Sequence, residues 1–291
     1  MKATDLAVAA FLAVVAGVQA NPAGPIPIVA AENFYGDIAA QIGGPYVRVT
    51  SVLVNPDQDP HLFEASPSVG RVVSAARIVI YNGIDYDPWM SSLLGAARSR
   101  NRRSIVVADL MGRKIGDNPH VWYDPATMLV LAKTLAGVLS AEDPAHRSDY
   151  ARRLAQFEDS LKPLQAEIAS LRRRYAETPV TATEPIFGYM FDALGMKVRN
   201  QSFQLSVMNN TEPAPSDIAG FENDLRTHRV RLMVFNSQAS DPVADRMEKL
   251  ARASRVPIVG ATETEPHGKN YQQWMSGELD AVDNALSGEA R

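Results

Sequence analysis

Two histidines in this chain, His61 and His120, follow a proline and lie in segments with carboxylates close by. His61 belongs to the segment 57–64 (DQDPHLFE), and His120 belongs to the segment 118–125 (NPHVWYDP). Imidazole is the side chain that most often binds metal ions in proteins, and a neighbouring proline restricts how the ring is presented. Each segment alone could equally hold an ordinary surface histidine. Together with further ligands they would form a metal site.

The second half of the chain offers carboxylates in comparable places. Glu184 follows the apolar run 179–183. Glu263 and Glu265 follow the apolar run 256–261. Glu184 could instead begin a helix, where the helix dipole favours a carboxylate, and the other two could be solvated loop charges. Two imidazoles and two carboxylates nevertheless suit one divalent first-row metal ion, because the carboxylates offset its charge and each binds through one or both oxygens.

Runs typical of strands alternate with helical patterns in both halves of the chain. In the first half we expect strands at 26–31, 47–54, 78–81 and 104–110, and helices at 34–42, 66–76, 88–97 and 125–139. In the second half we expect strands at 179–183, 196–199, 230–236 and 256–261, and helices at 186–194, 215–228, 241–254 and 270–286. This alternation predicts an α/β fold with two Rossmann-like parallel-sheet lobes. Ligands of such sheets bind beyond the carboxyl ends of the strands, where all the candidate residues lie.

One long helical stretch, 144–176, separates the two halves. Its apolar residues recur at steps of four and three from Tyr150 to Tyr175, which places them along one face, although a coiled coil would give the same pattern. About 33 residues at 1.5 Å each would span ~50 Å and reach across both lobes, and Pro163 predicts a kink or a locally broken hydrogen-bond ladder. We therefore expect a signal peptide at 1–20, an N-terminal α/β lobe at 21–143, a connecting helix at 144–177 and a C-terminal α/β lobe at 178–291.

Composition and charge exclude some classes of protein. The chain is 46% apolar and 21% charged, as globular proteins usually are. Its formal net charge of −4 gives no basic surface, so we expect no nucleic-acid partner.

The start combines Lys2, an apolar run at 6–20 and a small residue, Ala20, and this resembles a secretory signal peptide; an uncleaved membrane anchor is the alternative. The absence of cysteine predicts no disulfides and no lipid anchor, which fits a free periplasmic protein.

These motifs resemble the substrate-binding proteins of ABC transporters for zinc and manganese, the cluster A-I family. The likeness covers essentially the whole mature chain, and the Asn-Pro-His-Val-Trp run that contains His120 is its most specific part. It is also carried by Asp59-Pro60-His61 with Phe63-Glu64, the long helix, Glu184 with Phe187-Gly188-Tyr189, Asn210-Thr211-Glu212 with Pro215-Ser216, and the segment 271–275.

The resemblance implies a metal-ligand set. The first two ligands would be His61 and His120. The third would be Glu184, at a position that holds histidine in zinc-uptake members and glutamate in manganese-type members. The fourth, usually an aspartate, would be Glu263, with Glu265 as the alternative. The loop 91–115 contains no histidine, whereas zinc-uptake members often carry a histidine-rich insertion in this region.

By the same resemblance, we expect a monomeric carrier that captures Mn²⁺ or Zn²⁺ between its lobes and delivers it to a permease in the inner membrane. A secreted zinc hydrolase is the first alternative, but the sequence contains no H-E-x-x-H, no G-x-S-x-G and no cysteine nucleophile. An extracellular adhesin is the second, because relatives have been called adhesins; no feature of the sequence requires an adhesive surface. We therefore do not expect an enzyme.

Overall fold

The computed structural model describes residues 24–55, 60, 63–239 and 241–288. The expected signal peptide and His61 therefore lie outside the described residues. The strands are β1 (Ile26–Glu32), β2 (Val47–Leu53), β3 (Ile78–Tyr81), β4 (Arg103–Val106), β5 (Pro179–Ala182), β6 (Lys197–Val198), β7 (Met233–Asn236) and β8 (Ile258–Ala261). Within this part of the chain no helix has the length and apolar character needed to cross a bilayer.

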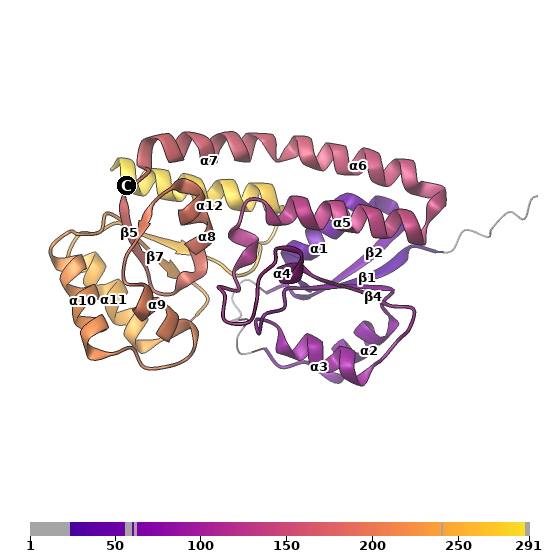
Figure 1. Cartoon of the computed structure of the whole chain (residues 1–291), viewed down its shortest axis with the longest axis horizontal. Coiled ribbons are helices and arrows are strands. Elements are labelled where there is room, and N and C mark those ends of the chain that lie inside the picture. The colour runs from indigo at the N-terminus through magenta and orange to yellow at the C-terminus, as the bar shows by residue number, and fades with distance from the viewer. Residues whose placement is uncertain (1–23, 56–59, 61–62, 240, 289–291) are drawn as a thin grey trace, which may run out of the picture.

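The helices surround these strands (Figure 1). In the first half they are α1 (Asn33–Gly43), α2 (Pro67–Ala75), α3 (Pro88–Ala96), α4 (Val107–Leu110) and α5 (Thr127–Glu142). Between the halves lie α6 (Arg147–Ser160) and α7 (Lys162–Tyr175). In the second half they are α8 (Gly188–Leu194), α9 (Gln201–Met208), α10 (Pro215–Arg226), α11 (Pro242–Ala253) and α12 (Tyr271–Ser287).

Two four-stranded parallel sheets form the centre of the molecule, as the alternation of strands and helices predicted. Their strand orders are β2-β1-β3-β4 and β6-β5-β7-β8. In the first sheet β2 lies on one side of β1, and β3 and β4 lie on the other; in the second sheet β6 lies on one side of β5, and β7 and β8 lie on the other. The strand order therefore reverses between β1 and β3 and again between β5 and β7. Crevices at such reversals are where open α/β sheets bind ligands. The α/β class with two parallel sheets is therefore confirmed.

The stretch between the halves is a pair of nearly continuous helices rather than one. Figure 1 shows α6 and α7 running along the top of the molecule above both sheets. The interruption falls at Leu161, whose carbonyl still accepts from Gln165 N at 3.0 Å. Pro163 is the second residue of α7 and has no N–H to donate back into α6. Of the kink or locally broken ladder expected from Pro163, the structure has the break, and the long connecting stretch consists of α6 and α7.

Two other expectations about the elements were incomplete. The strand expected at 104–110 ends at Val106, and residues 107–110 turn into α4. The hydrogen bond from Ala108 N to Asn82 O, at 3.0 Å, fixes this turn, and beyond it the chain leaves the strand pairing of the sheet. Helix α9 was not expected; it is held in place by Phe203, which packs edge-on against Phe221 at 4.8 Å. Both features depend on contacts with distant residues.

An aromatic cluster joins the two halves. Phe34 from α1 lies 4.9 Å from Trp122 and 5.6 Å from Trp274 of α12, measured between ring centroids. Tyr123 lies 5.0 Å from Phe187, which precedes α8. All five side chains are buried, and each aromatic pair contributes about 0.5–1.5 kcal/mol beyond its buried area. The apolar core is thus continuous between the lobes.

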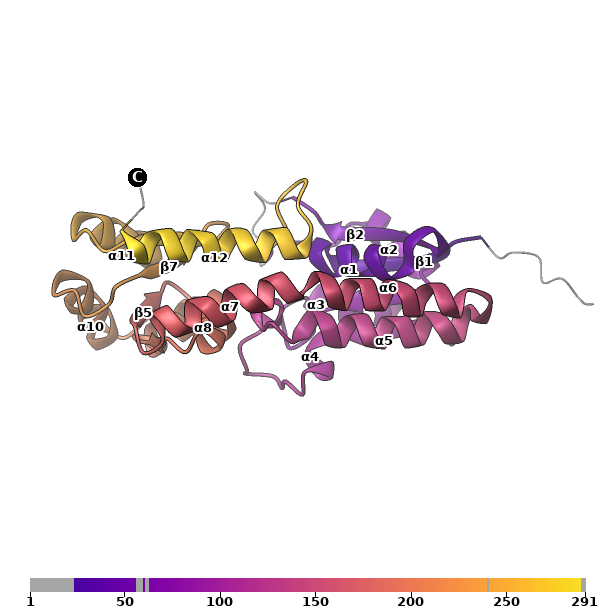
Figure 2. The ribbon, with the colours of Figure 1, turned by 90° about the horizontal axis from the view of Figure 1, so that it is seen from above.

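Helix α12 adds a second connection. Figure 2 shows α12 alongside α7, with its beginning over α1. At that end Tyr271 N donates to the Asp37 carboxylate at 3.0 Å, and Gln272 donates to Gln41 of α1 at 3.0 Å. Further along, Tyr175 of α7 donates to the Asp283 carboxylate of α12 at 2.7 Å. Two helical elements therefore span the junction.

This double connection predicts that the lobes close only slightly on ligand binding. Hinge closure requires a few residues that absorb large changes in φ and ψ, and neither helical element supplies them. Small-angle X-ray scattering of ligand-free and ligand-loaded protein should give nearly the same radius of gyration. A marked compaction on loading would contradict the rigid junction, and the break between α6 and α7 at Leu161 would then be the expected site of bending.

A buried acid in α12 predicts how stability depends on pH. Burial raises the pKa of Glu278 to about 7, against a weaker opposing hydrogen bond from Trp274 Nε1 at 3.1 Å. The native state holds the proton of Glu278 more tightly than the unfolded state does. The contribution of this proton to the free energy of unfolding is therefore lost as pH rises from the ordinary carboxyl range through about 7. Glu278→Gln stays neutral, so its melting temperature relative to wild type should rise between about pH 5 and about pH 8. Asp280→Asn, on the exposed face of the same helix, is the control; an equal rise there would contradict the assignment to Glu278.

Candidate metal centre

His120 follows the loop after α4 and is fully buried. Asn118 orients the ring: its Oδ1 accepts from His120 N at 3.1 Å and lies 2.7 Å from His120 Nδ1. The Asn118 amide nitrogen donates to Pro185 O at 2.7 Å, so the amide oxygen is the atom that faces the imidazole. The proton of the neutral ring therefore belongs on Nδ1, and the lone pair belongs on Nε2. Within the described part of the chain, Nε2 has no hydrogen-bond partner.

The two carboxylates come from strand ends of the second sheet. Glu184 follows β5, and Glu263 follows β8. Asn236, the last residue of β7, donates its amide hydrogens to Oε1 of both glutamates. Gln238 Oε1 accepts from the backbone N–H groups of Glu263 and Thr264, which fixes the path of the chain around the second glutamate. Three neighbouring strand ends thus supply both carboxylates and the amide that spaces them.

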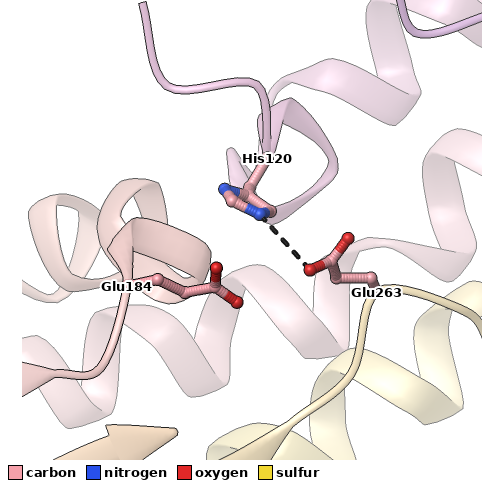
Figure 3. A group of neighbouring side chains, drawn as sticks. All are labelled: His120, Glu184 and Glu263. Carbon is pink, nitrogen blue, oxygen red and sulfur yellow. Dashed lines mark ion pairs between the residues drawn. The ribbon is translucent and has the colours of Figure 1, made fainter. Parts of the chain in front are cut away.

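His120, Glu184 and Glu263 converge on one point (Figure 3). One potential ligand atom from each lies within 4.8 Å of the others, and His120 Nε2 is 3.7 Å from Glu263 Oε1. Their exposed fractions are 0%, 3% and 0%. Burying two carboxylates so close together is unfavourable unless a cation lies between them. One imidazole nitrogen and two carboxylate oxygens at these separations match the donor set of a divalent metal ion.

Among the other sequence-predicted residues, the described Glu265 is not part of this group. His61 lies outside the described residues, so its role as a ligand stays a prediction. Glu265 is turned toward the first half, where its backbone exchanges hydrogen bonds with the Asn33 amide at 2.9 and 2.7 Å. Burial, and secondarily the charge of Asp37, raise the pKa of Glu265 to about 8. Glu263, and not Glu265, places a carboxylate oxygen close to the potential ligand atoms of His120 and Glu184, which favours Glu263 as the ligand.

Sequence reasoning missed two supporting side chains, Tyr86 and Asn236. Tyr86 lies in the loop after β3 and donates to Glu263 Oε2 at 2.7 Å. Asn236 ends a strand and Tyr86 lies in a loop that follows one, which is the same positional signal that identified the glutamates. A phenol and an amide are uncommon metal ligands, so their residue types gave no reason to single them out.

Comparisons with known proteins identify the family to which the chain belongs. A family model described as zinc-uptake complex component A, periplasmic, matches residues 28–285. The manganese ABC transporter substrate-binding lipoprotein PsaA of Streptococcus mitis is 24% identical over 286 residues, which cover 90% of this chain and 89% of that protein. The iron ABC transporter substrate-binding lipoprotein MtsA of Streptococcus pyogenes is 24% identical over 316 residues, covering 98% and 99%.

Solved structures share the fold. The periplasmic zinc-binding protein TroA from Treponema pallidum aligns with a TM-score of 0.74 at 18% identity and covers 90% of this chain and 99% of its own. A manganese-bound periplasmic metal-binding protein from Candidatus Liberibacter asiaticus aligns with a TM-score of 0.69 at 17% identity and the same coverage. At these identities the likeness supports the two-sheet architecture.

Proposed function

We propose, on the premise that this chain belongs to the zinc-uptake complex component A family of periplasmic proteins, that it captures one divalent metal ion between its two sheets and passes it to the membrane permease of an ABC transporter. The resemblance stated from the sequence is thereby confirmed at the level of the family. The observation that carries the proposal is the buried group of His120, Glu184 and Glu263. Such a group has no evident use in the apolar core of this protein other than to hold a cation.

Four ligands are proposed. His120 would bind through Nε2, because Asn118 engages Nδ1. Glu184 and Glu263 would bind through carboxylate oxygens, and His61 would complete the set. With lobes at 21–143 and 178–291 joined by 144–177, each lobe would provide two ligands. A cation held in this way would bring the two sheets together at their carboxyl ends.

The cargo is proposed to be Mn²⁺ or Zn²⁺. Two carboxylates make the site harder than a three-histidine site, which suits manganese. Zinc nevertheless lies above manganese in the intrinsic affinity order for nearly any such donor set. The relatives bear names that refer to manganese and iron, and the structural neighbours include zinc-binding and manganese-bound proteins. We therefore expect tight zinc binding in vitro whichever ion is transported.

A carrier fits these side chains better than an enzyme. A catalytic zinc keeps an open position for water or substrate. The three described side chains are almost completely shielded from solvent, which suits an ion that is held and then handed on. We propose a monomer that is free in the periplasm. The relatives are named lipoproteins, whereas the 291 residues of this chain include no cysteine to carry a lipid.

Neighbouring glutamates provide a matched test of the ligand set. Protein purified without chelator should contain about one equivalent of metal. Glu263→Gln removes a ligand and should weaken zinc binding by at least about 100-fold, since loss of a supporting contact alone costs ~10–100-fold. Glu265→Gln should bind zinc nearly as the wild type does. Competition titrations against a chelator measure both affinities, and the reverse order of effects would show that Glu265 is the ligand.

The same pair of variants tests transport. In a strain that lacks the chromosomal copy, the wild-type and Glu265→Gln proteins should restore growth under metal starvation, whereas Glu263→Gln should not. Zinc and manganese starvation are applied separately, which identifies the ion. If the strain grew equally well with and without each of the three proteins, the transport role would be overturned, whereas the metal-binding proposal would stand.

Replacing Glu184 should change the choice of ion. Glu184→His supplies a third imidazole, which suits tetrahedral zinc, and should raise zinc affinity relative to manganese by at least about tenfold, equal to ~1.4 kcal/mol. Glu184→Gln, which is neutral but keeps the shape, should weaken both ions. Paired titrations measure the two ratios. If the histidine variant left the ratio unchanged, Glu184 would be a helix-start residue without a role as a ligand.

A further inference from the structure

We propose that Tyr86 is a positioning residue that determines metal specificity: by holding one oxygen of Glu263, it restricts that carboxylate to one-oxygen binding and so favours zinc over manganese. The inference rests on the proposed metal-binding function and concerns the same site. Tyr86 comes from the first half of the chain, and Glu263 comes from the second. The contact between them is therefore also a contact between the lobes.

The hydroxyl of Tyr86 reaches Glu263 from inside the core. Its side chain is 4% exposed, and its ring centroid lies 4.9 Å from that of Trp122. The hydroxyl donates to Glu263 Oε2 at 2.7 Å, a short bond to a charged acceptor. A bond of this kind in a dry site fixes the carboxylate strongly.

The loop that carries Tyr86 is itself tightly held. Asp87 accepts from the backbone N–H groups of Asn82 and Gly83 at 2.7 and 2.8 Å. Ile84 and Asp85 between them adopt left-handed backbone angles, with φ of 45° and 65°, which residues with a side chain rarely do. Strained backbone of this kind persists only where surrounding contacts determine it, and it is common at functional sites. The position of the Tyr86 hydroxyl is thus built into the fold.

The two oxygens of Glu263 have different surroundings. Oε1 lies 3.7 Å from His120 Nε2 and accepts from Asn236, so it is the oxygen that faces His120. Oε2 is directed to the Tyr86 hydroxyl. Two-oxygen binding would require Oε2 to turn away from that hydrogen bond. One-oxygen binding keeps the coordination number low, as zinc prefers, whereas manganese is best served by a larger set of oxygens.

Tyr86→Phe removes the hydroxyl and keeps the ring. Zinc should bind about 10–100-fold more weakly, the usual effect of removing a partner of a metal ligand. Manganese should lose less, because the released Oε2 becomes a further oxygen ligand, so the ratio of the manganese Kd to the zinc Kd should fall. Tyr271→Phe is the matched control: this buried tyrosine donates across the same junction to Trp122 O at 2.9 Å, and its loss should leave the ratio unchanged.

Cobalt(II) in place of zinc gives a readout that a merely structural role would not change. Four-coordinate cobalt absorbs visible light strongly, and higher coordination weakens the absorption, so Tyr86→Phe should give a weaker spectrum than wild type and Tyr271→Phe should not. A crystal structure of the zinc-loaded wild type provides a measurement that needs no variant. It should show Glu263 bound through Oε1 alone with Oε2 on Tyr86, and two-oxygen binding there would overturn the inference.

The outcomes separate the two proposals. A wild-type chain that binds neither zinc nor manganese would overturn the proposed function, and this inference with it. A wild type that binds zinc, together with a Tyr86→Phe variant whose Kd ratio and cobalt spectrum are unchanged, would overturn the inference alone. Equal weakening of both ions with an unchanged spectrum would also overturn it, because Tyr86 would then support the site without selecting the ion.

Discussion

Two carboxylates and an imidazole buried against one another are the arrangement on which the rest of this structure depends. Glu184 and Glu263 have lost most of their contact with water, and the cost of burying carboxylates together requires hydrogen bonds or a cation to offset it. The surrounding side chains serve this need. Asn118 fixes the tautomer of His120, and Asn236 donates to both carboxylates. Asn236 stands at the end of β7, and Asn118 lies in the loop that follows α4.

The same site explains why the lobes are joined so firmly. The side chains that form it come from both halves, so any sliding at the junction would change the separation of His120 from Glu263. The aromatic cluster around Trp122 and the two spanning helical elements resist such sliding. Rigidity and low exposure together suit a protein that holds one small cation.

The choice between Glu263 and Glu265 shows how little local sequence says about a ligand. The two glutamates are separated by one residue and follow the same strand. One is turned toward His120, where Tyr86 and Asn236 meet its oxygens. The other lies at the junction beside α1, where burial favours its protonated form. Their different surroundings arise from residues more than 170 positions away, in the case of Tyr86, and more than 220 in the case of Asn33.

The sequence by itself determined the α/β class, the two parallel sheets and the break near Pro163, because periodicity and proline act through local backbone geometry. It also indicated His120, Glu184 and Glu263, since their residue types at strand ends are informative without coordinates. Tertiary structure alone decided the early end of β4, the presence of α9 and the roles of Tyr86 and Asn236. These depend on hydrogen bonds and packing between segments far apart in the chain, and no local pattern encodes which distant atoms will meet.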